Sequence, residues 1–178
     1  MTVLRARYGK IDGLTAELLQ KYRVRGPAVP VENIAHEEGA SIVIRQFNNE
    51  ISGLLLRQNG FSIIAVEKKQ PPTRRRFTIA HELGHMMLHE GKEVRVDTAF
   101  RVNLRSPESS TAEDVEEIES NAFAASLLMP ESFLKNDLSG FVFDIDDEAH
   151  IQSLAKRYQV STQAMTLRLV NLLSRGRL

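Results

Sequence analysis

The sequence predicts an α+β fold, and three observations support this. Three β-forming segments follow one another between residues 40 and 66. Turn residues rather than helices separate these segments, which favours an antiparallel sheet. Most of the remaining chain shows the apolar spacing of amphipathic helices. A chain of 178 residues organised in this way is expected to form a single domain, 1–178.

Composition is that of an ordinary globular protein, and it excludes several functions. Hydrophobic residues make up 42% of the chain and charged residues 26%. The formal net charge is zero, so no overall field attracts nucleic acid or an anionic membrane. The absence of cysteine excludes disulfides, cysteine–zinc sites and thiol nucleophiles. Neither a signal peptide nor an apolar run of ~18 residues is present, which predicts a cytoplasmic protein without a membrane span.

Two helices are predicted ahead of the strands. Residues 12–22 (DGLTAELLQKY) place their apolar side chains along one side of a helix. A shorter helix is predicted at 31–38. Pro30 precedes it, and Gly39 can adopt the left-handed conformation that commonly ends a helix.

The predicted strands cover Ala40–Phe47, Ile51–Arg57 and Phe61–Val66. Asn59-Gly60 tolerates the positive φ angles of a tight hairpin. We therefore predict a small antiparallel meander packed on the helices, with a further strand at Val94–Val102.

The later helices are predicted at 74–90, 111–129, 147–158 and 162–173. Ser110 to Glu113 form a capping-box pattern at the start of the second, and Pro130 ends it. The last two form a helical pair resembling a helix-turn-helix, which we treat as a C-terminal subdomain, 145–178.

An H-E-x-x-H pattern, from His81 to His85, lies inside the helix predicted at 74–90. Histidines at i and i+4 project from one helix face, one turn apart, so both can bind the same Zn²⁺ ion. Glu82 is placed to act as a general base, taking a proton from water at the metal and passing it to a leaving group. The opposite face of the helix is apolar and is expected to pack on the core.

A catalytic zinc site requires a third protein ligand. One class of enzymes uses a histidine six residues after the second, but Gly91 occupies that position here. His89 is expected to lie about 6 Å further along the helix, too far to share the ion, and is interpreted as structural. A glutamate from the helix 111–129 remains, and its acidic first half offers three candidates: Glu113, Glu116 and Glu117.

Geometry mildly favours Glu117, because its helical stripe becomes apolar one turn later. Asn121, four residues on, could hydrogen-bond the second ring nitrogen of a ligand histidine, although a hydrogen bond between packed helices is an equal alternative. The run Arg74–Arg76 is interpreted as solvated or paired with carboxylates rather than as a phosphate site.

Two segments, RRFTIAHELGHMMLH and EIESNAFAASLLMP, closely resemble the ImmA/IrrE-type metallopeptidases, whose pattern is HELGHxxLH followed by ExEANxFAxxLLMP. The similarity covers roughly residues 29–135, with Ser120 in place of the usual alanine. The resemblance implies a zincin-like fold of the glutamate-ligand type. It also implies Glu117 as the third ligand beside His81 and His85. Such a site accepts Zn²⁺ and also Mn²⁺.

The resemblance further implies an endopeptidase that cleaves a helix-turn-helix transcriptional repressor, in a stress-response, mobile-element or toxin–antitoxin setting. The rival hypothesis is a DNA-binding or partner-binding regulator with a structural or weakly active zinc site. Thr162, Gln163, Thr166 and Arg168 would face a groove, but the few positive charges argue against direct binding of nucleic acid. By chemistry alone, the residues that could steady an oxyanion are His36, His150 and Tyr158.

Overall fold

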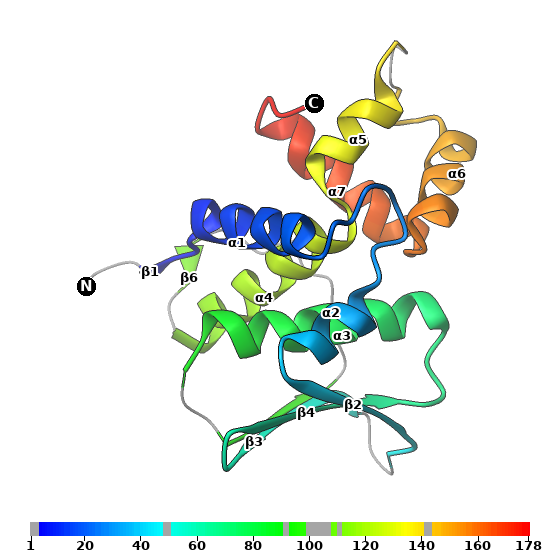
Figure 1. Cartoon of the computed structure of the whole chain (residues 1–178). Helices are drawn as coiled ribbons and strands as arrows, with labels where there is room; N and C mark the ends of the chain where they lie inside the picture. The colour runs from blue at the N-terminus through cyan, green and yellow to red at the C-terminus, as the bar shows by residue number, and fades with distance from the viewer. Residues whose placement is uncertain (1–3, 48–50, 91–92, 99–107, 110–111, 141–143) are drawn as a thin grey trace.

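The structure of the chain, a computed structural model, describes residues 4–47, 51–90, 93–98, 108–109, 112–140 and 144–178. It is α+β, as predicted, with a four-stranded sheet below a group of helices (Figure 1). The turn residues Asn48 and Asn49 between the first two predicted strands, the predicted strand beyond Thr98, and Ser110 and Thr111 of the capping box lie outside these residues.

The helices are α1 (Tyr8–Lys21), α2 (Val31–Glu37), α3 (Pro72–Leu88), α4 (Ala112–Leu128), α5 (Glu131–Leu138), α6 (Glu148–Tyr158) and α7 (Thr162–Ser174). The strands are β1 (Leu4–Arg5), β2 (Ala40–Arg45), β3 (Ile51–Gln58), β4 (Phe61–Glu67), β5 (Val94–Thr98) and β6 (Glu108–Ser109). Most bounds fall within a few residues of the predicted ones. None of the described helices is long and apolar enough to cross a membrane.

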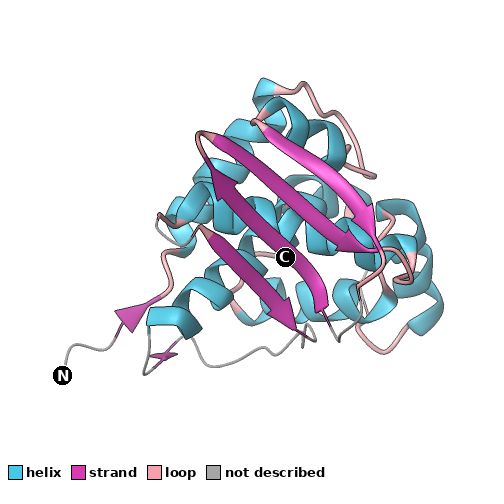
Figure 2. Cartoon of the chain, turned by 90° about the horizontal axis from the view of Figure 1, so that it is seen from below, coloured by secondary structure: helices cyan, strands magenta, loops and turns pink. Residues whose placement is uncertain are grey.

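The prediction of a purely antiparallel meander is wrong. The strand order is β2-β4-β3-β5, and β2 pairs with β4 in parallel (Figure 2). The hairpin between β3 and β4 is confirmed, with positive φ at Asn59 and Gly60. Alternation along a strand identifies the strand but not its neighbour, because pairing depends on how the apolar faces pack. The continuous apolar run of β4 suits its central place in the sheet.

A helix was not predicted where α5 lies. Pro130 ends α4, as expected, but its extended backbone also begins the next helix, and its carbonyl accepts the amide of Leu134 at 3.0 Å. Leu134 and Leu138 then anchor this helix on the core, which explains why a loop is not formed.

Helix α3 is the centre of the molecule, because it packs against α2, α4, β3 and β4 (Figures 1 and 2). Its contact with α4 is close at Gly84, where a Cβ would lie 3.1 Å from Cδ1 of Phe123. Small size at Gly84 therefore lets α4 approach the histidine-bearing helix. The predicted turn between α6 and α7 is confirmed: Gln159 is left-handed, and the Ser161 hydroxyl accepts the Ala164 amide at 3.1 Å.

Candidate metal centre

The structure brings His81, His85 and Glu117 together, and we call these three residues the inner cluster. Each offers one ligand atom, and these atoms all lie within 4.8 Å of one another. The two Nε2 atoms are 2.9 Å apart. The Glu117 carboxylate oxygens lie 3.5 Å from Nε2 of His81 and 3.4 Å from Nε2 of His85. Tetrahedral Zn²⁺ with bonds of ~2.0–2.1 Å would separate its ligand atoms by about 3.3 Å, so the donor set fits this ion.

The other candidate ligands are placed differently. Glu116 is paired with Arg95 of β5 at 2.6 Å, and the side chain of Glu113 lies outside the described residues. Arg95 also contacts Glu117 at 2.6 Å and so steadies its carboxylate from the sheet side. Burial would raise the pKa of Glu117, but the adjacent side chains of His81 and His85 hold it far below its ordinary value. Glu117 is therefore ionised, as a metal ligand must be.

Burial makes His85 a suitable ligand. His81 and His85 are fully buried. Burial lowers the pKa of His85 to about 4, against the raising effect of Glu117. The imidazole is therefore neutral at pH 7, the form that binds a metal.

The predicted support for His81 is confirmed. Its Nδ1 lies 3.1 Å from the side-chain oxygen of Asn121. Because that oxygen can only accept, Nδ1 carries the proton, and Nε2 presents its lone pair to the inner cluster.

Support for His85 comes from residues that the sequence did not indicate as a unit. His89 Nδ1 lies 3.2 Å from His85 Nδ1, and His89 Nε2 lies 2.9 Å from Glu119 Oε2. The carboxylate of Glu119 can only accept, so His89 donates through Nε2 and accepts through Nδ1. His85 must then donate through Nδ1, which leaves its Nε2 lone pair for a metal. We call His89 and Glu119 the outer cluster.

Arg7 completes the outer cluster. Its backbone amide, Nε and Nη2 donate to the Glu119 carboxylate at 2.7, 2.9 and 2.6 Å. Burial would raise the pKa of Glu119, but the hydrogen bonds from Arg7 and His89 lower it to about 2. The interpretation of His89 as structural is consistent with this geometry. Arg7 lies 112 residues from its partner, and no local sequence pattern links the two.

Glu82 is fully buried on the sheet side of α3. A Cβ at Gly53 of β3 would lie 2.5 Å from Oε1 of Glu82 and 2.5 Å from Cγ2 of Thr78. The pairing of β3 with β5 is irregular between Ile51 and Gly53. Only glycine at this position leaves room for the glutamate, a constraint that the sequence did not reveal.

Two further arginines hold the ends of α3. Arg57 of β3 donates through Nη2 to the carbonyls of His85 and His89, at 2.6 and 2.9 Å. A cation at this C-terminal end complements the helix dipole. Arg76 donates to the carbonyls of Val29 and Gln159, so it binds backbone rather than the carboxylates or solvent expected for this arginine run.

The residues proposed to steady an oxyanion gain little support. The hydroxyl of Tyr158 is buried and donates to Asp137 at 2.8 Å, so it is not available for this role. His36 is exposed on α2, and His150 is half-buried near the start of α6. For these two histidines the role stays an untested prediction.

Comparison with known proteins supports one family. A family model described as Peptidase_M78, IrrE N-terminal-like domain, matches residues 35–170. "Uncharacterized immunity region protein 2" of Bacillus phage phi105 is 26% identical over 145 residues, which cover 82% of this chain and 84% of the phage protein. A solved "Mycobacterium tuberculosis transcriptional regulator" matches with a TM-score of 0.58 and 13% identity, over 88% of this chain. This chain spans only 45% of that regulator, and the likeness concerns the fold alone.

Proposed function

Because this chain belongs to the IrrE N-terminal-like family of M78 peptidases, we propose that it is a zinc-dependent endopeptidase whose metal is held by the inner cluster. The observation that carries the proposal is the convergence of three ligand atoms from α3 and α4, beside a buried glutamate on α3. A divalent ion bound there would supply Lewis acidity to a water molecule and to the scissile carbonyl.

Glu82 moves the proton in this reaction. It accepts a proton from the attacking water, whose oxygen bonds to the carbonyl carbon. The C–N bond then breaks, and Glu82 delivers the proton to the departing amine. The burial of Glu82 keeps bulk water from competing for that proton.

The edge of the sheet is suited to hold an extended substrate. β5 is an edge strand in the described sheet, and its side chains Val94 and Val96 are 50% and 45% exposed. Arg95, between them, contacts Glu117, so this edge lies beside the inner cluster. A polypeptide added as a further strand would therefore pass the metal centre with its backbone hydrogen-bonded to β5.

We further propose a helix-turn-helix repressor as the protein substrate and a cytoplasmic location. The phi105 relative is described as an immunity region protein, and the resemblance to the ImmA/IrrE-type metallopeptidases implies a repressor of this kind as the substrate. The rival hypothesis is a regulator that binds DNA through α6 and α7, and the position of Arg168 argues against one of the DNA contacts it requires. Arg168, proposed for the groove, is 9% exposed and donates to the carbonyl of Met129 at 3.1 Å.

The test is to incubate the purified chain and Zn²⁺ with helix-turn-helix proteins encoded beside it, with and without a chelator. We expect a defined cut that the chelator abolishes. Glu82→Gln should bind zinc normally and lower the rate by about 10²–10⁴-fold, the usual contribution of a general base. Cleavage by Glu82→Gln at the wild-type rate would show that Glu82 is not the base. Tight binding without cleavage would favour the regulator hypothesis.

A further inference from the structure

We infer that the cavity between α1, α4 and α7 binds a small organic anion, one that has an apolar body and a single carboxylate or phosphate head. This cavity is separate from the inner cluster. Its volume is about 220 Å³, room for roughly seven water molecules at the ~30 Å³ that each occupies in the liquid.

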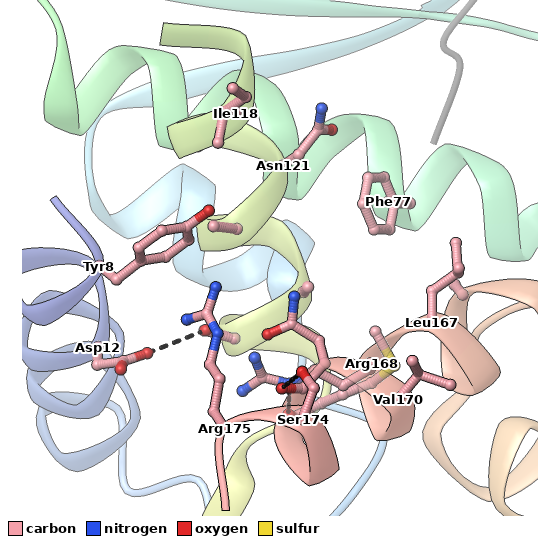
Figure 3. Close-up of a pocket in the computed structure, with 16 residues that line it drawn as sticks. Tyr8, Asp12, Phe77, Ile118, Asn121, Leu167, Arg168, Val170, Ser174 and Arg175 are labelled. Carbon is pink, nitrogen blue, oxygen red and sulfur yellow. Dashed lines mark hydrogen bonds between the residues drawn. The ribbon is translucent and has the colours of Figure 1, made fainter. Parts of the chain in front are cut away.

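Apolar side chains of α3, α4 and α7 line one part of the cavity, and the polar side chains of the second half of α7 and of Arg175 line another. Figure 3 shows Phe77, Ile118 and Leu167 around one end, and Arg168, Ser174 and Arg175 at the other. This separation of apolar and polar groups matches a ligand with two chemically different ends.

A buried cation carries the inference. Arg168 is 9% exposed and lines the cavity. Its Nε donates to the carbonyl of Met129 at 3.1 Å, but among the described residues its two Nη groups make no hydrogen bond or ion pair. Burial lowers its pKa to about 10, so the guanidinium remains charged at neutral pH. The hydrogen bond to Met129 uses the Nε donor of Arg168, so its two Nη groups remain able to bind a ligand.

The remaining charges of the wall favour an anion. Asp12 is the only acidic residue among the described residues that line the cavity. Its carboxylate is already paired with Arg177 at 2.6 Å and accepts the hydroxyl of Ser126 at 3.3 Å. Arg175 lies over the ring of Tyr8, 4.1 Å from its centre, and adds a second cation. An anionic head would neutralise a charge that is costly to bury alone.

Binding should be measured by calorimetry with octanoate, octyl phosphate, 1-octanol and inorganic phosphate as probes. We expect octanoate or octyl phosphate to bind at least about 10-fold more tightly than 1-octanol, the worth of one charge-assisted pair. Which of the two binds better identifies the head group. Equal binding of 1-octanol, or of inorganic phosphate and octyl phosphate, would overturn the inference, as would no binding of either amphiphile.

Variants locate the site. Arg168→Gln should weaken octanoate binding about 10-fold or more, and exposed Arg175→Gln by a smaller factor. Arg25→Gln, another exposed arginine, is the matched control and should bind as the wild type does. If Arg168→Gln does not fold, two other single variants test the site: Arg175→Gln and Ala122→Phe, which fills the cavity. Unchanged octanoate affinity in both of these variants would show that octanoate binds elsewhere and would overturn the inference.

One wall residue connects the cavity to the inner cluster. Asn121 lines the cavity and also accepts the hydrogen bond from His81. On the proposed function, occupancy of the cavity should change the affinity for zinc, and zinc should change the affinity for octanoate by the same factor. The two failures are distinguishable. Octanoate binding without zinc binding would overturn the metal site alone, whereas zinc binding unaffected by octanoate would overturn the connection alone.

Discussion

The inner and outer clusters each join histidine to a glutamate of α4, yet they differ in exposure and in what they can do. Glu117 and Glu119 are two residues apart on α4; Glu117 contacts His85 of α3, and Glu119 contacts His89, the residue that follows α3. The side chain of Glu119 is 1% exposed and is enclosed by Arg7 and His89. The side chain of Glu117 is 41% exposed.

This difference in exposure explains which of the two carboxylates can bind a metal ion and which can only support the site. Glu119 is hydrogen-bonded on both oxygens by protein groups, so it can only hold its neighbours in place. Glu117 faces solvent on one side, which leaves access for a metal and for a substrate. A catalytic metal site needs such an open position, while its support needs none.

Breaking the inner cluster should have the largest effect. Glu117→Gln removes the charge of the proposed third ligand, so zinc affinity should fall by more than the ~100-fold expected at most for the loss of an outer partner. Competition with a chromophoric chelator measures this. Glu116→Gln is the matched control, because Glu116 also pairs with Arg95 but lies outside the inner cluster. A larger loss of zinc affinity in Glu116→Gln than in Glu117→Gln would show that Glu116, rather than Glu117, is the ligand.

Breaking the outer cluster should have a smaller effect on the same quantity. His89→Leu removes the acceptor for His85 and should lower zinc affinity about 10–100-fold. His89→Gln should restore part of it, because an amide can accept from His85 and donate to Glu119. Circular dichroism would check that both variants fold. Normal zinc affinity in His89→Leu would show that the outer cluster merely packs the helices together.

A third change should separate metal binding from proton transfer. Gly53→Ala places a Cβ against Glu82, so turnover should fall by up to about 100-fold, as for an ~1 Å displacement of a reacting group. Zinc affinity should stay near that of the wild type, since the inner cluster is not displaced. Gly13→Ala, at a glycine with open space around it, is the control. Loss of zinc rather than of turnover would contradict this separation.

The two clusters should also titrate in different pH windows in the metal-free protein. The pKa of His85 is lowered from 6.5 to about 4, so the unfolded chain gains a proton first as pH falls. The contribution of neutral His85 to the free energy of unfolding should therefore decline as the pH falls through this interval. The pKa of Glu119 is lowered from 4.5 to about 2, so its contribution should decline only in that lower window. Urea unfolding at several pH values measures both, and Glu119→Gln should flatten the lower window alone.

The sequence predicts those parts of the centre that depend on local spacing. His81, Glu82 and His85 follow from one helical turn, and the link between Asn121 and a ligand histidine follows from helical periodicity on α4. The parallel partner of β2 could not be predicted, because it depends on packing between segments. The requirement for glycine at position 53 could not be predicted either, because a side chain there would crowd Glu82 only when β3 packs on α3.

The bond between Arg7 and Glu119 has a consequence for the order in which the chain matures. During synthesis His81 and His85 leave the ribosome before Glu117, and 112 residues separate Arg7 from Glu119 in the sequence. Contacts so distant in sequence are slow to form because a long loop must close first. We therefore expect the proposed metal centre to form late, when Arg7 reaches Glu119 of α4 and Glu119 fixes His89 against His85.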